Sequence, residues 1–388
     1  MSQNREGEPA RQRGITELPE LAGALDGEDA IAFQKLFHVS RSVGRLVPPE
    51  SMRGWIESFF GSVQAVETQT IVKVTNLVTL EGALFNQLRA SRPMDTRVSG
   101  DLLQAIADSA GDPFCRPEQG TPEDVFGRVR GRHSVTASNV AKYDAFHGLV
   151  IFDQHNPLAI SEEAVRDYLE VGRRWALAAL RVDPEARYSF FMWNALWKSG
   201  ASIIHGHAQV ACSRDLHYAR VEQLRRSALR YRQESGRDYF SDLVSAHRAL
   251  GLALDYPSPN TGLGSPAAGP TRSSVAATIL TNLTPTKEKE VLILTSGLAD
   301  PLPGAIYRVL DCFINRLGVS SFNLAIYMPP LSESPEDWGG FPHLTRIVDR
   351  GDPMNRTSDV GAMELYASPV ISSDPFRVME ALRETFMA

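Results

Sequence analysis

The spacing of hydrophobic residues predicts a repeated alternation of strands and helices. Short runs of alternating or β-branched apolar residues are typical of strands, whereas apolar residues at every third or fourth position are typical of helices. The predicted strands are 68–80, 134–138, 148–152, 186–193, 203–212, 275–283, 290–295 and 322–328. The predicted helices are 30–60, 161–180, 216–254, 305–317 and 374–387.

Polar stretches divide this pattern into two parts. Residues 1–25 are polar and rich in Gly, Pro and Arg, which predicts a mobile tail. Residues 256–275 contain four Pro and three Gly and form the best candidate for a linker. We therefore expect an N-terminal half over 26–255 and a C-terminal half over 276–388. Both halves contain paired strands, one long helix and further strands, without a close residue-level repeat.

The composition is that of a packed globular protein, with 43% apolar and 22% charged residues. The formal net charge is -6, and no block of Lys and Arg suggests a nucleic-acid track. No apolar run approaches the roughly 20 residues that a membrane helix needs. We therefore expect neither nucleic acid nor a membrane among the partners, and a phosphate-bearing substrate would need local cations.

The cysteines favour a reducing compartment. Cys115, Cys212 and Cys312 are an odd and widely spaced set, which does not suggest a disulfide framework. The first residues have no apolar core of the kind that a signal peptide contains. The expected location is the cytoplasm.

One segment concentrates the candidate chemistry, Ser199-Gly-Ala-Ser-Ile-Ile-His-Gly-His-Ala-Gln209. Because side chains alternate along a strand, His205, His207 and Gln209 are expected on one face, with ~6.6 to 7 Å between neighbours. The two small residues between them would lie on the opposite face, against a closely packed element. The pattern predicts three polar side chains that converge on one cavity.

The turn before this strand adds an anion-binding feature. It contains Ser199, Gly200 and Ser202, whose backbone N–H and hydroxyl groups can bind an anion. A neutral imidazole is a good nucleophile toward phosphorus. The pattern therefore favours phosphoryl chemistry at His207. Two other interpretations remain open, which are joint metal ligation by His205 and His207, and ordinary packing of strand histidines.

The stretch from Asn194 to Gln209 resembles a known active-site signature. Its His-x-His-x-Gln pattern is similar to that of the galactose-1-phosphate uridylyltransferase and diadenosine-tetraphosphate phosphorylase branch of the histidine-triad (HIT) superfamily. Weaker similarity covers most of the chain from about residue 85 onward. The resemblance implies an α+β fold with two HIT-like halves, each a mainly antiparallel sheet packed with helices. It also implies a homodimer.

The resemblance implies a ping-pong mechanism with a covalent intermediate. His207 would attack the α-phosphorus of a nucleotide, the carbonyl near His205 would fix its tautomer, and the Gln209 amide would bond a phosphoryl oxygen. Gln209 cannot shuttle a proton, unlike the third histidine of hydrolytic relatives. We therefore expect a nucleotidyltransferase that moves a nucleoside monophosphate group between an NDP-sugar or dinucleotide and a phosphorylated acceptor.

Other functions remain open at this point. A phosphorylase would use inorganic phosphate as the acceptor and release a nucleoside diphosphate. A hydrolase would use water, which Gln209 disfavours. A non-catalytic module would bind a metal or a nucleotide without becoming labelled. The base and the acceptor are not determined by the sequence.

Further residues are assigned to substrate binding by the resemblance. Arg89 and Arg92, in Leu88-Arg-Ala-Ser-Arg-Pro93, are similar to a pair of phosphate-binding arginines, and an Arg fork suits phosphate oxygens. Asn139 corresponds to a nucleoside contact. The remaining substrate-binding candidates belong to the signature and its turn: Asn194, Ser199, Gly200 and Ser202.

The resemblance also implies a structural zinc site. The uridylyltransferases complete this site with a Cys-x-x-Cys pair, where this chain has Asp112-Pro-Phe-Cys115. Asp112, Cys115, His155 and His205 provide a carboxylate, a thiolate and two imidazoles, which are all zinc ligands. The site is equally compatible with a metal-free form, as in the phosphorylases, and no other cofactor is expected.

The second half departs further from the family pattern. Leu324 and Ile326 stand where some uridylyltransferases have metal-binding histidines, so no second metal site is expected. Arg346, Arg350 and Arg356 add positive charge where the family builds its acceptor pocket, which suits a phosphorylated acceptor. We expect His147 to be a core or edge residue, and Trp193 to be a core residue rather than one that stacks on a base.

Overall fold

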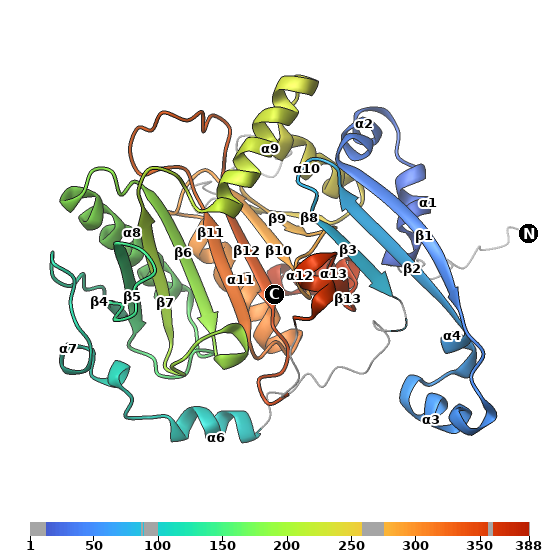
Figure 1. Cartoon of the computed structure of the whole chain (residues 1–388), viewed down its shortest axis with the longest axis horizontal. Coiled ribbons are helices and arrows are strands. Elements are labelled where there is room, and N and C mark those ends of the chain that lie inside the picture. The colour runs from blue at the N-terminus through green and yellow to red at the C-terminus, as the bar shows by residue number, and fades with distance from the viewer. Residues whose placement is uncertain (1–12, 87, 89–99, 258–274, 356–359, 388) are drawn as a thin grey trace, which may run out of the picture.

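A nine-stranded sheet is the centre of the molecule (Figure 1), whose computed structural model describes residues 13–86, 88, 100–257, 275–355 and 360–387. Its strand order is β4-β5-β7-β6-β11-β12-β10-β9-β8, and every neighbouring pair is antiparallel. The strands are β4 (Ser134–Ser138), β5 (Phe146–Phe152), β6 (Tyr188–Ala195), β7 (His207–Ser213), β8 (Ala253–Pro257), β9 (Val275–Thr281), β10 (Val291–Thr295), β11 (Phe322–Tyr327) and β12 (His343–Asp349).

The two halves have the same topology and join at the middle of this sheet. Each half runs strand, strand, helix, strand, strand: β4, β5, α8, β6 and β7 in the first, and β9, β10, α11, β11 and β12 in the second. Strand β6 pairs with β11, so the strand orders of the two halves mirror each other across that pair. The α+β fold with two mainly antiparallel halves is thereby confirmed.

Two helices cover one face of the sheet. Helix α8 (Glu162–Val182) begins at Ser161, whose side chain accepts a hydrogen bond from Ala164 N, and α11 (Leu302–Asp311) is its counterpart. Both lie behind the strands in Figure 1. They pack on residues such as Ala208, Val210, Leu324 and Ile326 in the largest hydrophobic core. Leu324 and Ile326, which stand where some uridylyltransferases have metal-binding histidines, are therefore core residues in this protein.

The other face is covered mainly over the second half. Helices α9 (Ala219–Ser235) and α10 (Tyr239–Ala249) share a second core with strands of the C-terminal half and with a separate four-stranded sheet. That sheet has the order β1-β2-β3-β13 and is formed by β1 (Phe37–Arg45), β2 (Thr68–Asn76), β3 (Gly82–Asn86) and β13 (Val370–Ile371). It lies at the right in Figure 1.

The remaining helices connect these layers. They are α1 (Leu18–Gly23), α2 (Gly27–Leu36), α3 (Glu50–Phe60), α4 (Val63–Glu67), α6 (Gly100–Asp108), α7 (Pro117–Gly120), α12 (Ala362–Tyr366) and α13 (Pro375–Met387). No helix among the described residues is long and apolar enough to cross a membrane.

Three sequence-based boundaries need correction. The predicted helix 30–60 is interrupted by β1, which pairs with β2 along nine residues, so tertiary pairing overrides the local helical spacing. The mobile tail does not extend to residue 25, because Ile15 and Leu18 are buried in the second core. Strand β7 begins at His207 rather than at residue 203. Most of the predicted linker lies outside the described residues.

Candidate active site

Strand β7 presents His207 and Gln209 on the face of the sheet that α8 does not cover. Ala208, Val210 and Cys212 alternate with them and belong to the core beneath α8. Gly206 immediately before the strand is required by a close approach, because a Cβ atom there would lie 2.8 Å from the Phe152 ring and 2.9 Å from Gln154 O. The small residues of the motif therefore allow the close packing that the sequence predicted.

The His207 ring is held in one tautomer. Its Nδ1 lies 2.8 Å from the His205 carbonyl oxygen, and since a carbonyl only accepts, Nδ1 must carry the proton and donate. The opposite ring nitrogen, Nε2, is then unprotonated in the neutral imidazole. Burial, with only 5% of the residue exposed, lowers the pKa of His207 and so favours this neutral form. The geometry suits a nucleophilic nitrogen.

An edge-on aromatic contact fixes the same ring from the side. The Phe114 ring centroid lies 5.1 Å from that of His207 and 6.2 Å from that of His205, with interplanar angles of 79° and 77°. Phe114 comes from the short helical turn Pro113–Cys115, which Asp112 begins by accepting a hydrogen bond from Phe114 N. The segment with two candidate metal ligands thus also supports the candidate nucleophile.

Gln209 is contacted from the neighbouring strand and loop. Its side-chain oxygen Oε1 lies 2.8 Å from His147 Nε2 on β5 and 3.4 Å from the Tyr143 hydroxyl. His147 is only 1% exposed, and the Tyr143 ring lies over it at a centroid distance of 3.8 Å. The sequence placed His147 in packing; the structure also gives it a polar contact with a predicted catalytic residue.

His205 lies outside the strand that carries His207 and Gln209. It precedes β7, and its Nε2 donates to Phe152 O at 2.8 Å, which turns Nδ1 toward a cluster of other ligating groups. Its backbone carbonyl meanwhile holds His207. His205 therefore connects the candidate nucleophile to the candidate metal site, with its backbone serving one and its side chain the other.

The four predicted metal ligands meet in space. The ligand atoms of Asp112, Cys115, His155 and His205 all lie within 4.8 Å of one another. Cys115 Sγ is 3.4 Å from His155 Nδ1 and 3.5 Å from His205 Nδ1, and Asp112 oxygens are 3.8 Å from the same two nitrogens. The structure thus brings together four residues that are spread from position 112 to position 205 of the sequence.

The arrangement of lone pairs fits a cation. His155 Nε2 donates to Ile106 O at 2.9 Å and His205 Nε2 donates to Phe152 O, so both Nδ1 atoms present lone pairs. These two acceptors lie only 3.0 Å apart, and Asp112 Oδ2 nearby is buried without a hydrogen-bond partner. A positive charge between these atoms would satisfy all of them, and zinc accepts this donor set.

The turn before β7 uses its serine to hold its own backbone. The Ser199 hydroxyl donates to Leu196 O at 2.7 Å, and Gly200 has a φ of 97°, a left-handed conformation that favours glycine. Ser202 is exposed at the end of the turn. The backbone N–H groups are used within the turn as well, because Ser199 N and Ala201 N donate to Leu196 O and Gly200 N donates to Trp197 O. The sequence-based expectation that the N–H groups of Ser199 and Gly200 bind an anion therefore needs correction, since their hydrogen bonds are made inside the turn.

Asn194 links the turn to the second half. Trp193 pairs with Ala208, which places Asn194 beside His207 at the end of the two strands. Asn194 Oδ1 accepts from Asn323 Nδ2 at 2.6 Å, and the same Asn323 nitrogen lies 2.8 Å from Ser199 O. Arg350 Nη1 in turn donates to Asn323 Oδ1 at 2.5 Å. Asn323 belongs to no motif that the sequence analysis could have used to identify it.

The other substrate-binding candidates are less centrally placed. Asn139 Oδ1 accepts from Ala141 N, and its Nδ2 lies 3.2 Å from His147 Nε2, so the side chain sits beside the contact between His147 and Gln209. Arg89, Arg92 and Arg356 lie outside the described residues. Their proposed phosphate contacts stay predictions.

A cavity of about 720 Å³ lies on the same side of the sheet, over the second half. Asn323, Ala325 and Tyr327 of β11 line it, together with residues 79–82 and Arg350. Arg346 also lines it, but its charge is already matched, because Nε is 2.7 Å from Glu290 and Nη1 is 2.7 Å from Glu81. Asn323 belongs both to this cavity and to the contact with Asn194.

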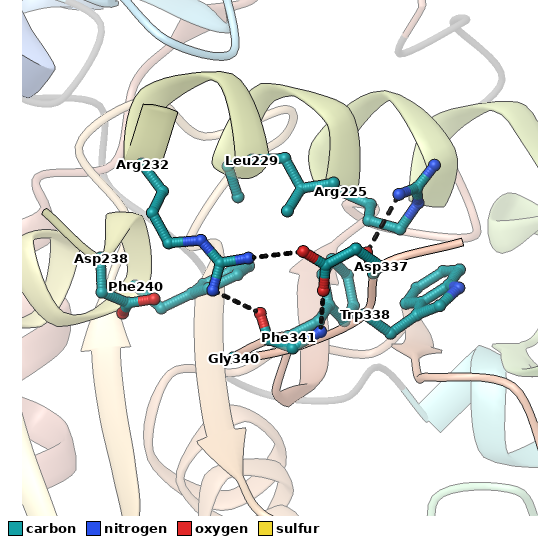
Figure 2. Close-up of a pocket in the computed structure, with 11 residues that line it drawn as sticks. Arg225, Leu229, Arg232, Asp238, Phe240, Asp337, Trp338, Gly340 and Phe341 are labelled. Atoms are coloured by element: carbon teal, nitrogen blue, oxygen red, sulfur yellow. Dashed lines mark hydrogen bonds and ion pairs between the residues drawn. The ribbon is translucent and has the colours of Figure 1, made fainter. Parts of the chain in front are cut away.

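A separate, much smaller pocket lies under α9. Figure 2 shows Arg232 reaching from α9 to Asp337 and to the backbone of the segment 337–341, with Arg225 bonded to the same segment. The pocket contains none of the predicted site residues. The hydrogen bonds of Arg225 and Arg232 to this segment attach α9 to it.

The comparisons with known proteins show the fold. An ADP-glucose phosphorylase from Arabidopsis thaliana with bound ADP-glucose has a TM-score of 0.58 at 18% identity, over 80% of this chain and 97% of that one. A GalT-like protein from Arabidopsis thaliana has a TM-score of 0.54 at 18% identity, over 71% and 92%. A uridylyltransferase mutant has a TM-score of 0.50 at 13% identity, over 71% and 93%.

The chain therefore has the fold shared by these nucleotide-transferring and phosphorolytic enzymes, as the His-x-His-x-Gln resemblance implied. No protein-family model matches the sequence, and no curated protein sequence matches it either. At this level of identity the likeness shows the fold alone. The chemistry rests on the residues around His207.

Proposed function

We propose that the protein is a nucleotidyltransferase that forms a covalent nucleotidyl intermediate on His207. One observation carries the proposal. The Nδ1 proton of His207 is committed to the His205 carbonyl, which leaves Nε2 as the unprotonated nitrogen of a ring whose neighbours on the same face of the sheet are Gln209 and Asn194. The fold shared with nucleotide-transferring enzymes supports the same conclusion.

The two half-reactions balance without a proton relay. In the first, Nε2 of His207 attacks the α-phosphorus, the new N–P bond forms, and the bond from phosphorus to the bridging oxygen breaks with its electron pair leaving on that oxygen. In the second, an oxygen of the acceptor attacks the same phosphorus and the N–P bond breaks, which returns the lone pair to His207. Phosphate-type leaving groups need little protonation.

Gln209 supports transfer rather than hydrolysis. Its amide can donate to a phosphoryl oxygen and stabilise the charge that accumulates in the transition state. It cannot act as a general base toward water, so it does not favour loss of the intermediate by hydrolysis. This reasoning disfavours a hydrolase and leaves transferase and phosphorylase as the two forms of the proposed reaction.

The proposed donor is a nucleotide sugar or a dinucleotide. The ADP-glucose bound in a fold neighbour supports the first choice. The proposed acceptor is a sugar phosphate or inorganic phosphate, and the cavity lined by Asn323 and Arg350 is the candidate place for the part of the substrate beyond the α-phosphate. The phosphorylase form is favoured by the neighbour named for that reaction.

Product analysis tests the proposal and separates its two forms. The protein would be incubated with ADP-glucose, UDP-glucose or diadenosine tetraphosphate, each with inorganic phosphate, with a sugar phosphate or with water alone. We expect turnover that depends on an acceptor, with a nucleoside diphosphate formed from phosphate or a new nucleotide sugar formed from a sugar phosphate. Equal turnover with water alone would contradict the proposal.

We further propose that Asp112, Cys115, His155 and His205 hold a zinc ion with a structural role. The facing Nδ1 lone pairs of the two histidines and the unpartnered Asp112 oxygen support this. A bound ion would supply the positive charge that these atoms lack. The chain's own residues would then keep the His205 backbone, and so the His207 ring, in place.

Metal analysis of the purified chain tests the zinc proposal. We expect about one zinc per chain, lost in Cys115→Ala together with roughly 10 °C in melting temperature, because binding of a structural metal contributes folding free energy. His38→Asn, at an exposed histidine of β1, is the matched control and should retain the metal. Wild-type protein without metal and with unchanged stability after chelation would contradict the proposal.

A further inference from the structure

We propose that His147 is a positioning residue that fixes the orientation of the Gln209 amide. The observation is the 2.8 Å contact between His147 Nε2 and Gln209 Oε1, made between neighbouring strands on the face of the sheet that carries His207. This inference rests on the proposed nucleotidyl transfer at His207. It adds a residue that the His-x-His-x-Gln motif does not contain.

The position of His147 is determined by its surroundings. It lies on β5 two residues before Leu149, which pairs with Gln209, so His147 and Leu149 point to the same face. Its backbone oxygen accepts from Asn139 N at 2.9 Å and from Lys142 Nζ at 3.1 Å. The Tyr143 ring covers the imidazole. The ring is therefore held without needing the Gln209 contact.

The orientation of the Gln209 amide follows from this contact. When Oε1 accepts from the imidazole N–H, the amide nitrogen points to the other side and its N–H groups can donate to a phosphoryl oxygen. The reversed amide would present its carbonyl oxygen to an anionic substrate, which is repulsive. His147 therefore selects the one of two amide orientations that can assist transfer.

The opposite tautomer would reverse this selection. Asn139 Oδ1 is committed to Ala141 N, so Asn139 presents its own N–H groups to His147 Nε2 at 3.2 Å. With the proton on Nδ1, Nε2 would accept from Asn139 and Gln209 would have to turn its nitrogen inward. Nδ1 is buried without a hydrogen-bond partner, and buried unpaired N–H groups are rare, which favours the proton on Nε2.

The charge state of His147 is consistent with orientation rather than proton transfer. Burial is the largest influence and lowers the pKa of His147, and Lys142 lowers it further, while the Gln209 hydrogen bond, Asp144 and Asp124 act in the other direction. The ring is therefore neutral near pH 7. A neutral ring can donate to Gln209 without placing a second positive charge beside the phosphoryl group.

Single-turnover kinetics of His207 labelling test the inference, with the donor that the product analysis identifies. His147→Phe keeps an aromatic ring but loses the donor, and His147→Gln restores an N–H near the position of Nε2. We expect the Phe variant to slow labelling by about 10- to 100-fold with donor affinity changed less than about twofold, because one transition-state hydrogen bond is misdirected. The Gln variant should recover most of the rate.

A double-mutant cycle separates orientation from a general structural effect. If His147 acts only through Gln209, then His147→Phe should change the labelling rate less than about twofold in a Gln209→Ala background. An equal loss in both backgrounds, or a full rate in the single Phe variant, would overturn the inference.

A measurement on the resting protein keeps the inference testable even if no nucleotide is transferred. Nitrogen-15 spectra of the imidazoles, assigned with the His147→Phe variant, should show His147 as the neutral Nε2–H tautomer near pH 7. The Nδ1–H tautomer would overturn the inference. Failure of His207 labelling together with an Nε2–H tautomer would instead count against the proposed function.

Discussion

The two halves of the nine-stranded sheet share a topology but differ in what covers their common face. In the first half, β7 presents His207 and Gln209, and the covering cluster is small and consists of Phe114, Leu149 and a few neighbours. In the second half, the equivalent strand β12 presents Leu344, which belongs to the large second core, and Arg346 and Val348, which line the cavity of about 720 Å³. The first half thus presents the candidate nucleophile under a small cover, whereas the second half combines a large core with a cavity.

Arg346 illustrates the difference most clearly. It pairs in register with Ala325, which pairs with Met192, which pairs with Gln209, so all four lie in one row across the sheet. At one end of this row, the Gln209 side chain contacts His147 and Tyr143. At the other end, the Arg346 charge is neutralised by Glu81 and Glu290. Equivalent strands of one fold therefore place a nucleophile candidate in one half and a matched ion-pair network in the other.

The largest expected effect comes from comparing the substitution of one histidine in each half. His207 is the first residue of β7, and His343 is the first residue of β12. We expect His207→Asn to lower kcat by on the order of 10⁴-fold or more, because the nucleophile is lost. His343→Asn should leave kcat within about twofold. The measurement is steady-state turnover, with melting curves to verify folding.

Comparable activity of these two variants would remove the distinction between the halves. If the His207→Asn protein does not fold, the His207→Gln variant, which retains more of the ring's volume, would be measured in its place. Full activity in a folded variant at this position would contradict the assignment of the nucleophile.

A second, smaller effect concerns the cover of the second half. His247 on α10 donates through Nδ1 to Leu243 O and lies with Nε2 3.4 Å from Leu283 N, so it is neutral and fully buried. Burial lowers the pKa of His247 to about 4. Because the unfolded chain binds a proton more readily, stability should fall as the pH drops from about 6.5 to about 4, by up to roughly 3 kcal/mol from this residue.

Urea unfolding at pH 7.5 and pH 4.5 measures this dependence. We expect His247→Gln to show a smaller loss of stability between the two pH values than the wild type. His217, with its pKa also lowered to about 4 by burial, should account for part of the remainder. His38→Gln, at an exposed position, is the control. An identical pH dependence in the His247 variant would show that this residue does not govern acid stability.

The smallest expected effect tests whether the second half contributes to the site. Asn323 bonds Asn194 and the Ser199 carbonyl from across the junction of the two halves. We expect Asn323→Ala to lower kcat/KM by about tenfold, because the loss of neutral hydrogen bonds loosens the turn. Asn315→Ala, at an exposed site near the end of α11, should have no effect. Equal kinetics in both variants would place the site in the first half alone.

Much of the fold could be predicted from the sequence where local pattern and tertiary structure agree. The predicted strand 68–80 and the predicted helix 161–180 correspond to β2 (68–76) and α8 (162–182), because their periodicity reflects one buried face. Strand β1 was missed because most of its residues are exposed and its strand character comes from pairing with β2. The joining of the two halves through β6 and β11 has no local signal.

The same distinction between local pattern and tertiary contact applies to the candidate site. His205, His207 and Gln209 were found because they are close in sequence and form a motif. The metal cluster was found only because the resemblance supplied four distant positions, which the structure then brings together. His147 and Asn323 were missed because their roles depend on contacts made across neighbouring strands. The sequence intervals between these residues do not predict such contacts.

The central claim is tested most directly by locating the nucleotidyl group. The protein would be mixed with the donor nucleotide without acceptor, digested with trypsin at alkaline pH, and analysed by tandem mass spectrometry. Cleavage after Lys198 and Arg214 isolates a peptide that contains both His205 and His207. The account predicts a nucleoside monophosphate adduct on His207 that disappears when acceptor is added. An adduct on another residue, or acceptor-dependent turnover without any adduct, would contradict it.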